Sequence, residues 1–230
     1  MKLLTVDTST STCSVALTID GRLAAESLFD TERTLSERLL ASVDAVLRDS
    51  GICLDDLDGF GVSLGPGSFT GVRIGVSTVK GFSLATGKPV AGFSSLSMLA
   101  MNFPACSLPL CTLFDARKKE VYAALYRCGA LPEQIIADRV ISPERFLGLI
   151  EGPALFAGNG ALKYRALIEE TLGDRAVFAP DHCHQPRAAA GAVLALEAFR
   201  AGGLLPLPAL NPTYIRPSEA ELMRMMQKTL

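Results

Sequence analysis

Two aspartates stand where a pair of carboxylates could hold a nucleotide. Asp7 ends the apolar run "LLTVD" (3–7) and Asp115 ends "LPLCTLFD" (108–115), and each run is typical of a short buried strand. Carboxylates at the ends of two strands that face one cleft could bind a magnesium-nucleotide through water. The alternative is that each acid caps the turn after its strand, and the sequence leaves both interpretations open.

A glycine-rich loop adds a candidate anion site. In "SLGPGSFTGVRIGVSTVKG" (63–81), the backbone N–H groups of Gly65, Gly67 and Ser68 precede a predicted helix and could hold a phosphate, with Thr8 beside Asp7. The loop matches neither the P-loop pattern nor G-x-G-x-x-G. A tight strand-to-helix turn would use the same residues, so this alternative also stays open.

Metal chemistry is disfavoured. Both histidines, His182 and His184, lie in the single Pro-flanked loop "DHCHQP", whereas zinc sites usually take ligands from separated segments. The six cysteines form no C-x-x-C pair, and we expect them to be reduced. We therefore expect no metal and no metalloprotease activity.

The bulk composition narrows the class of protein. The 230 residues are 49% hydrophobic and 20% charged, which is ordinary for a globular protein. The formal net charge of −2 argues against a chain that binds nucleic acid by itself. No apolar run approaches the roughly 20 residues that cross a bilayer, and no signal peptide is evident. We expect a cytoplasmic protein that does not associate with membranes.

The order of predicted elements repeats along the chain. The first half reads as three strands (3–7, 13–19, 22–29), a helix that opens on a capping pair at Thr34 and Glu37, a strand (59–64), a second helix and a strand (88–93). The second half repeats this order from residue 108, and "GNG" (158–160) matches "GPG" (65–67). We therefore predict a duplicated, two-lobed α/β fold of the actin-like type (ASKHA, ribonuclease H-like), each lobe a mixed sheet covered by helices.

The predicted lobes span 1–104 and 105–230. Residues 181–203 read as a loop and an Ala/Leu-rich helix, and the Pro-rich remainder reads as an extended tail with a short helix at its end. The alternative is that the C-terminal helix and the tail pack back on the first lobe.

The predicted helix at 68–86 carries a face of small residues. Gly71, Gly75 and Thr78 share one side, and two glycines inside a helix cost about 1 kcal/mol each relative to alanine. A close backbone neighbour would account for that cost. The pattern alone favours the protein's own sheet over a second chain.

Four motifs, in order, resemble the TsaB (YeaZ) family of bacterial tRNA-modification proteins: "DTSTSTCSVAL", "GPGSFTGVRIG", "DARKKEVYAAL" and "NPTYIR". The resemblance is strong through about residue 127 and weak from Leu131 to about Leu207. It implies an actin-like fold and a role in making threonylcarbamoyladenosine beside the tRNA anticodon. Such members are non-catalytic partners of the catalytic paralogue TsaD, with the ATPase TsaE completing the complex. We therefore expect this chain to form a homodimer when it is alone and to meet tRNA only through the complex.

The resemblance also places the dimer interface on the helices at 34–50 and 68–86, which reverses the preference for internal packing of the small face. The residues expected there are Leu35, Leu39, Leu40, Val43, Gly71, Val72, Arg73, Gly75, Val76, Thr78 and Val79. Leu35 and Leu64 replace a histidine and an arginine that are common in relatives, which weakens the case for nucleotide contact. ATP with magnesium is therefore expected only within the complex.

The main alternative is an actin-like small-molecule kinase or ATPase that would use Asp7 and Asp115.

Overall fold

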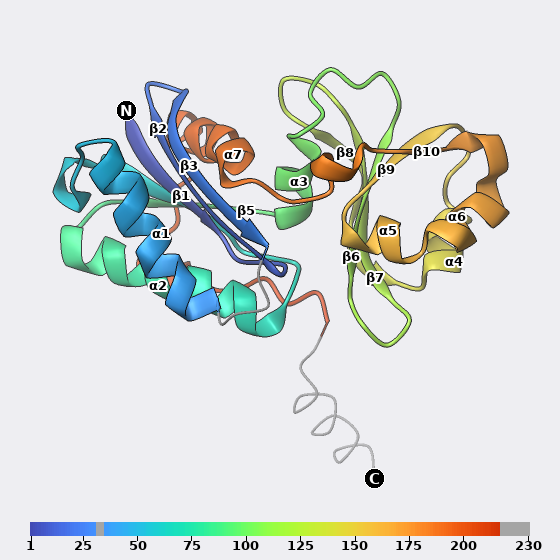
Figure 1. Cartoon of the computed structure of the whole chain (residues 1–230), viewed down its shortest axis with the longest axis horizontal. Coiled ribbons are helices and arrows are strands. Elements are labelled where there is room, and N and C mark those ends of the chain that lie inside the picture. The colour runs from blue at the N-terminus through green and yellow to red at the C-terminus, as the bar shows by residue number, and fades with distance from the viewer. Residues whose placement is uncertain (31–34, 217–230) are drawn as a thin grey trace, which may run out of the picture.

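The computed structural model describes residues 1–30 and 35–216. Two sequence predictions, the cap at Thr34 and the short helix at the end of the tail, lie outside the described residues. The described chain forms two lobes, each built on one five-stranded sheet (Figure 1).

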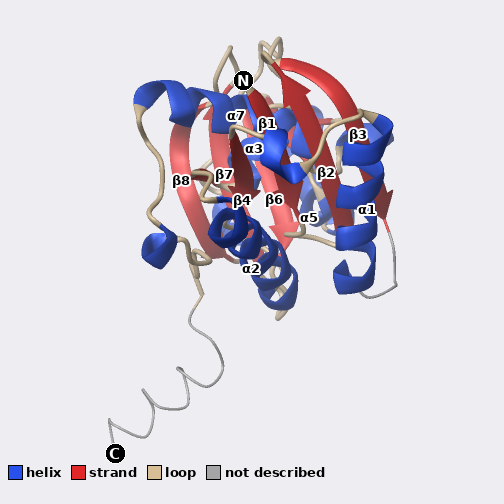
Figure 2. Ribbon diagram, turned by 90° about the vertical axis from the view of Figure 1, so that its left-hand side faces the viewer, coloured by secondary structure: helices blue, strands red, loops and turns tan. Residues whose placement is uncertain are grey.

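The first sheet has the order β3-β2-β1-β4-β5. Its strands are β1 (Lys2–Asp7), β2 (Thr12–Ile19), β3 (Arg22–Asp30), β4 (Gly59–Ser63) and β5 (Val90–Phe93). β1, β2 and β3 form an antiparallel meander, while β4 pairs parallel with both β1 and β5. The helices α1 (Leu35–Asp49) and α2 (Phe69–Thr86) lie side by side on this lobe (Figure 2). Their apolar faces bury the inner side of the sheet, because leucine and valine recur at helical spacing.

The second sheet repeats this topology in the order β8-β7-β6-β9-β10. Its strands are β6 (Leu110–Asp115), β7 (Val121–Arg127), β8 (Glu133–Ile141), β9 (Ala154–Ala157) and β10 (Ala176–Phe178), and the helices α4 (Pro143–Leu147), α5 (Asn159–Lys163) and α6 (Arg165–Leu172) pack on it. Asp7 and Asp115 end the equivalent central strands β1 and β6. The predicted duplication is therefore confirmed.

The two halves exchange one helix each. α3 (Ser95–Ala100) follows β5 but packs on β6 and β7 of the second sheet, with Leu96 and Leu99 buried there. α7 (Ala188–Ala201) follows β10 but packs on β1, β2, β4 and β5 of the first sheet. Figure 1 shows α7 on the side of the first sheet opposite α1 and α2. Each sheet is thus covered on one face by its own half and on the other by a helix from the other half.

The tail also returns to the first lobe. Leu205 bridges to Val90 of β5, Leu210 is buried in the core of the first lobe, and the Thr213 N–H donates to the Leu64 carbonyl oxygen at 2.7 Å. In the structure, α7 and the described part of the tail therefore pack on the first lobe. Four 3₁₀ turns complete the described chain: Leu54–Asp56, Gly173–Arg175, Asp181–Cys183 and Leu207–Ala209. Within residues 1–30 and 35–216, no helix has the length and apolar character needed to span a membrane.

Candidate functional site

Asp7 is fully buried at the end of β1. The Ser63 hydroxyl and the Ser9 backbone N–H (3.1 Å) both donate to its Oδ1. Its Oδ2 has no hydrogen-bond partner of good geometry among the residues that the structure describes. Burial raises the pKa of the Asp7 carboxyl above its usual range, and the hydrogen bonds from Ser63 and Ser9 offset this only in part.

The raised pKa of Asp7 predicts a pH dependence of stability. Because the folded state holds this proton more tightly than the unfolded state does, the contribution is full below the unfolded pKa and is lost as pH rises through the folded pKa. We expect the free energy of unfolding of the wild-type chain, relative to Asp7→Asn, to fall as the pH rises above the ordinary pKa of an aspartate. Urea unfolding of both proteins over a series of pH values measures it, and a constant difference would contradict the assignment.

The glycine loop is filled by the chain's own atoms. A Cβ at Gly67 would overlap the Ser9 carbonyl oxygen, which already accepts the Ser68 N–H at 2.7 Å. The Ser68 side chain caps α2 by accepting from the Gly71 N–H at 3.3 Å. The Gly65 carbonyl oxygen accepts the Ser95 N–H at 2.9 Å. This geometry is a strand-to-helix turn closed by the β1–β2 turn, so the Ser68 and Gly71 N–H groups do not point at an open phosphate site.

The small face of α2 also packs inward. A Cβ at Gly71 would overlap the Thr8 carbonyl oxygen, and one at Gly75 would lie 2.5 Å from Thr8 Oγ1. The Thr8 hydroxyl itself donates to the Gly71 carbonyl oxygen at 2.7 Å. The prediction that these glycines admit a second chain is therefore wrong, because the β1–β2 turn of the same chain occupies that space.

Several residues expected at a dimer interface lie in the core of the first lobe. These are Leu39, Val43, Gly71, Val72, Gly75, Val76 and Val79, all buried. Leu35 and Thr78 are partly exposed, Arg73 is exposed, and Leu40 is 56% exposed. A partner helix could meet only the outer side of α1 and α2, and that contact stays a prediction.

The outer side of α2 carries an aromatic–cationic stack that the sequence analysis missed. The Arg73 guanidinium lies 3.7 Å from the Phe69 ring centroid, and its Nε donates to the Tyr214 hydroxyl at 2.6 Å. The rings of Phe69 and Tyr214 lie 5.1 Å apart. Beside this stack is a shallow hollow of about 330 Å³ lined by Phe69, Thr70, Arg73, Ile74 and Ser77. Tyr214 belongs to "NPTYIR", so this motif packs against "GPGSFTGVRIG".

Asp115 differs from Asp7 in its surroundings. It accepts from Lys163 Nζ at 2.8 Å and from the Arg117 backbone N–H at 3.0 Å, and its own N–H donates to Asn159 Oδ1 at 3.0 Å. Both oxygens of this second candidate carboxylate therefore already accept hydrogen bonds, one from Lys163 and one from the backbone of the following turn.

The turn after Asp115 is strained. Arg117, Lys118 and Lys119 have φ values of 61°, 50° and 62°, in the left-handed region where residues with a Cβ lose about 1–2 kcal/mol each. The Ala116 N–H donates to the Glu120 carbonyl oxygen at 3.0 Å and closes the turn. Arg216, at the end of the described tail, donates to the Ala116 carbonyl oxygen at 2.6 Å and pairs with Glu120. The tail thus fastens the first lobe to this turn of the second.

The histidine loop is structural. His184 is buried, its Nδ1 accepts the Gly158 N–H at 3.1 Å, and its Nε2 lies 2.9 Å from the Ala179 carbonyl oxygen. Both ring nitrogens are thereby used. No group of three or more histidine, cysteine or acidic residues in the described part of the chain could hold a metal ion. All six cysteines are free; Cys13 and Cys111 are buried, and Cys53 is exposed.

Comparison with known proteins gives consistent matches. The family model described as "TsaD: tRNA N6-adenosine threonylcarbamoyltransferase" matches residues 30–223. The tRNA threonylcarbamoyladenosine biosynthesis protein TsaB of Bacillus subtilis is 32% identical over 225 residues, covering 96% of each chain. The protein of the same name from Escherichia coli is 38% identical over 130 residues, covering 55% of each chain.

Solved structures agree with these sequence matches. YeaZ from Pseudomonas aeruginosa has a TM-score of 0.81 at 30% identity, over 93% of this chain and 99% of that one. Component A of the Acidaminococcus fermentans (R)-2-hydroxyglutaryl-CoA dehydratase has a TM-score of 0.51 at 14% identity, over 86% and 98% of the two chains. The second likeness shows the fold alone.

Proposed function

Because the chain belongs to the TsaB (YeaZ) family of proteins for tRNA threonylcarbamoyladenosine biosynthesis, we propose that it is a non-catalytic subunit of that pathway. In this proposal it pairs with a TsaD-type catalytic paralogue, and a TsaE-type ATPase joins the complex. The chain forms a homodimer when it is alone, because similar lobes present similar surfaces.

One observation supports the non-catalytic assignment: the chain's own groups occupy the places where the sequence suggested that a nucleotide could bind. The β1–β2 turn fills the glycine loop, and Lys163 pairs with Asp115. A nucleotide would have to displace these groups before it could bind.

The buried, unpartnered Oδ2 of Asp7 favours the second candidate, an actin-like kinase or ATPase. Calorimetry of the full chain with ATP and magnesium separates the two functions. A partner subunit alone should bind weakly or not at all, whereas binding at micromolar levels would favour the kinase.

The outer side of α1 and α2 is the surface that we assign to the partner. Leu40, Phe69 and Leu84 expose 56%, 42% and 75% of their surface there. Arginine and tyrosine side chains are enriched among the residues that anchor protein interfaces, and exposed apolar side chains that gather beside them mark an interaction surface. This revises the predicted interface from the inward face of α2 to its outward face.

Leu40→Glu should weaken pairing with the TsaD-type subunit at least ten-fold, because a charge would be buried in an apolar contact. Size-exclusion chromatography and co-purification from cells measure pairing, and circular dichroism checks the fold. Leu162→Glu is the matched control, since Leu162 is 40% exposed on α5 of the other lobe. Normal pairing by Leu40→Glu would place the interface elsewhere, and failure of any TsaD-type protein to co-purify with the wild-type chain would refute the proposed function.

A further inference from the structure

The strained turn between β6 and β7 has three cationic residues at positions whose backbone conformation glycine would adopt with the least strain. Glycine and asparagine are the residues that favour a left-handed backbone. Arg117, Lys118 and Lys119 adopt it in succession, with φ between 50° and 62°. Selection for stability alone would not place three long cationic side chains there, so their charge needs a separate explanation.

The turn is held in one shape from both sides. Backbone hydrogen bonds close it at Ala116 and Glu120, and Arg216 of the tail reaches both of these residues. All three cationic residues are exposed, and the Arg117 side chain is 86% exposed. In Figure 1 the turn lies at the lower edge of the second lobe, beside the last described residues of the tail. A fixed turn that presents cations to solvent is preorganised for an anionic partner.

The local charge contrasts with the rest of the chain. Among the residues that the structure describes, Arg117 and Lys163 pair with Asp115, and Arg216 pairs with Glu120. With Lys118 and Lys119, these seven side chains carry five positive and two negative charges, in a chain whose net charge is −2.

The equivalent turn of the first lobe, between β1 and β2, is built of small polar residues instead. Three of them, Thr8, Ser9 and Thr10, are buried. The cationic turn is therefore not a requirement of the repeated fold.

We propose that the β6–β7 turn binds the phosphate backbone of tRNA through Arg117, Lys118 and Lys119. This inference rests on the proposed function, which supplies tRNA as the polyanion, and it adds a direct contact where the sequence analysis expected only an indirect one. A protruding turn suits an extended chain of phosphates, because neighbouring cations can each neutralise a different phosphate and release its counterions.

The test is tRNA binding by the triple variant Arg117→Gln, Lys118→Gln, Lys119→Gln, in the complex with the TsaD-type subunit and in the full chain alone. The probe is an unmodified tRNA transcript, followed by fluorescence anisotropy at several salt concentrations. We expect Kd to rise at least ten-fold. The slope of log Kd against log salt should fall by about 2 to 3, since each of the three lost phosphate contacts removes roughly 0.7–0.9. Unchanged Kd and slope would overturn the proposal.

Two further variants separate charge at the turn from general effects. Arg22→Gln, Lys88→Gln, Arg200→Gln removes the same charge from first-lobe positions outside α1 and α2 and should bind tRNA as the wild type does. In a second variant, glycine replaces Arg117, Lys118 and Lys119. This variant should lose tRNA binding because the charges are gone, while its Tm stays level or rises because the backbone strain is relieved. Equal loss of binding in the first-lobe variant, or retained binding in the glycine variant, would overturn the proposal.

The same samples distinguish the two hypotheses. If the wild-type chain forms no complex, the proposed function fails. The tRNA affinities of the full wild-type chain and of its glutamine variant, measured alone at low salt, then test the contact at the turn. If the complex forms but the glutamine variant binds tRNA normally, only the present inference fails. Micromolar binding of inorganic phosphate that depends on these residues, with tRNA binding unchanged, would assign the turn to a small anion and overturn the proposal.

Discussion

Gly71→Ala should destabilise the chain by about 1–3 kcal/mol, the usual cost of overpacking a tight site. A Cβ at this position overlaps the Thr8 carbonyl oxygen, which is backbone and cannot rotate away. The Thr8 hydroxyl is also bonded to the Gly71 carbonyl oxygen, so a shift of the helix would break that bond. Urea unfolding followed by circular dichroism gives the free energy of unfolding.

Gly81→Ala is the matched control in the same helix. Gly81 is exposed, and no atom lies within 4 Å of a Cβ built there. Alanine should therefore raise stability by up to about 1 kcal/mol, through helix propensity alone. If the two variants are equally stable, the close contact between α2 and the β1–β2 turn does not exist as described.

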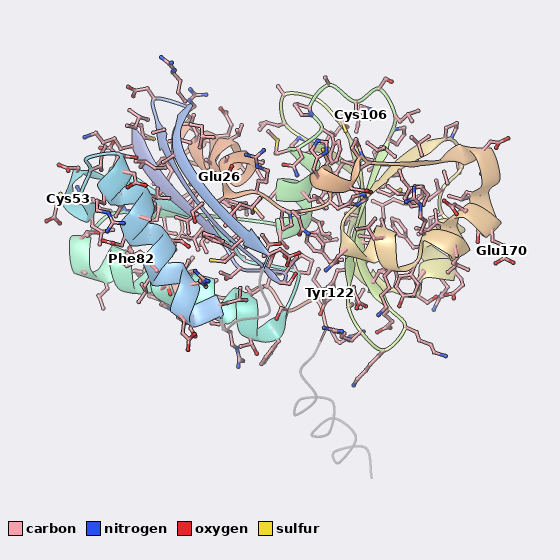
Figure 3. The ribbon with its side chains drawn as sticks, in the orientation of Figure 1. Glu26, Cys53, Phe82, Cys106, Tyr122 and Glu170 are labelled. Carbon is pink, nitrogen blue, oxygen red and sulfur yellow. The ribbon has the colours of Figure 1, made fainter. Side chains whose placement is uncertain are left out.

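A fragment of residues 1–104 should fail to fold as a monomer, the largest effect that the structure predicts. It lacks α7, whose Ala195 packs over Gly61 and whose Phe199 packs over Gly59 of β4. It also lacks Glu26's partners: Glu26 (Figure 3) accepts from the Ala189 N–H at 3.1 Å and pairs with Arg187 at the start of α7. Leu3 and Ala91, buried under α7, would face water.

Adding a peptide of residues 186–216 should restore the fold, since it supplies α7 and the tail. Circular dichroism and amide exchange of the fragment, with and without the peptide, are the measurements. A cooperative unfolding transition of the monomeric fragment alone would show that α7 is dispensable to the first sheet.

The sequence predicted the strands and long helices well because their signals are local. Alternating or continuous apolar runs, Gly51 after α1 and the "GPG" and "GNG" landmarks each depend on a few neighbouring residues. The matched order of these elements was enough to predict the duplication and the placement of Asp7 and Asp115. α3 and β10 were missed because they have six and three residues, too few to show a period.

The site was harder to predict because its contacts join distant residues. The small face of α2 is visible in the sequence, but periodicity cannot tell whether its neighbour is Thr8 of the same chain or another protein. The pattern alone favoured internal packing, which is what the structure shows, and the family resemblance reversed that preference. Arg73 meets Tyr214 across 141 residues, and no local pattern reports such a contact.

The exchanged helices bear on how such a chain could have arisen. If an ancestral gene encoded one half, its product would have carried a sheet with one bare face and a final helix that reaches away from it. In a dimer of two copies, the final helix of each copy could then have packed on the bare sheet face of the other, as in a domain-swapped dimer with two-fold symmetry. Duplication and fusion of the gene would make this trade intramolecular and permanent. Once fused, the two turns after β1 and β6 were free to diverge, one into a buried polar contact and the other into an exposed cationic one.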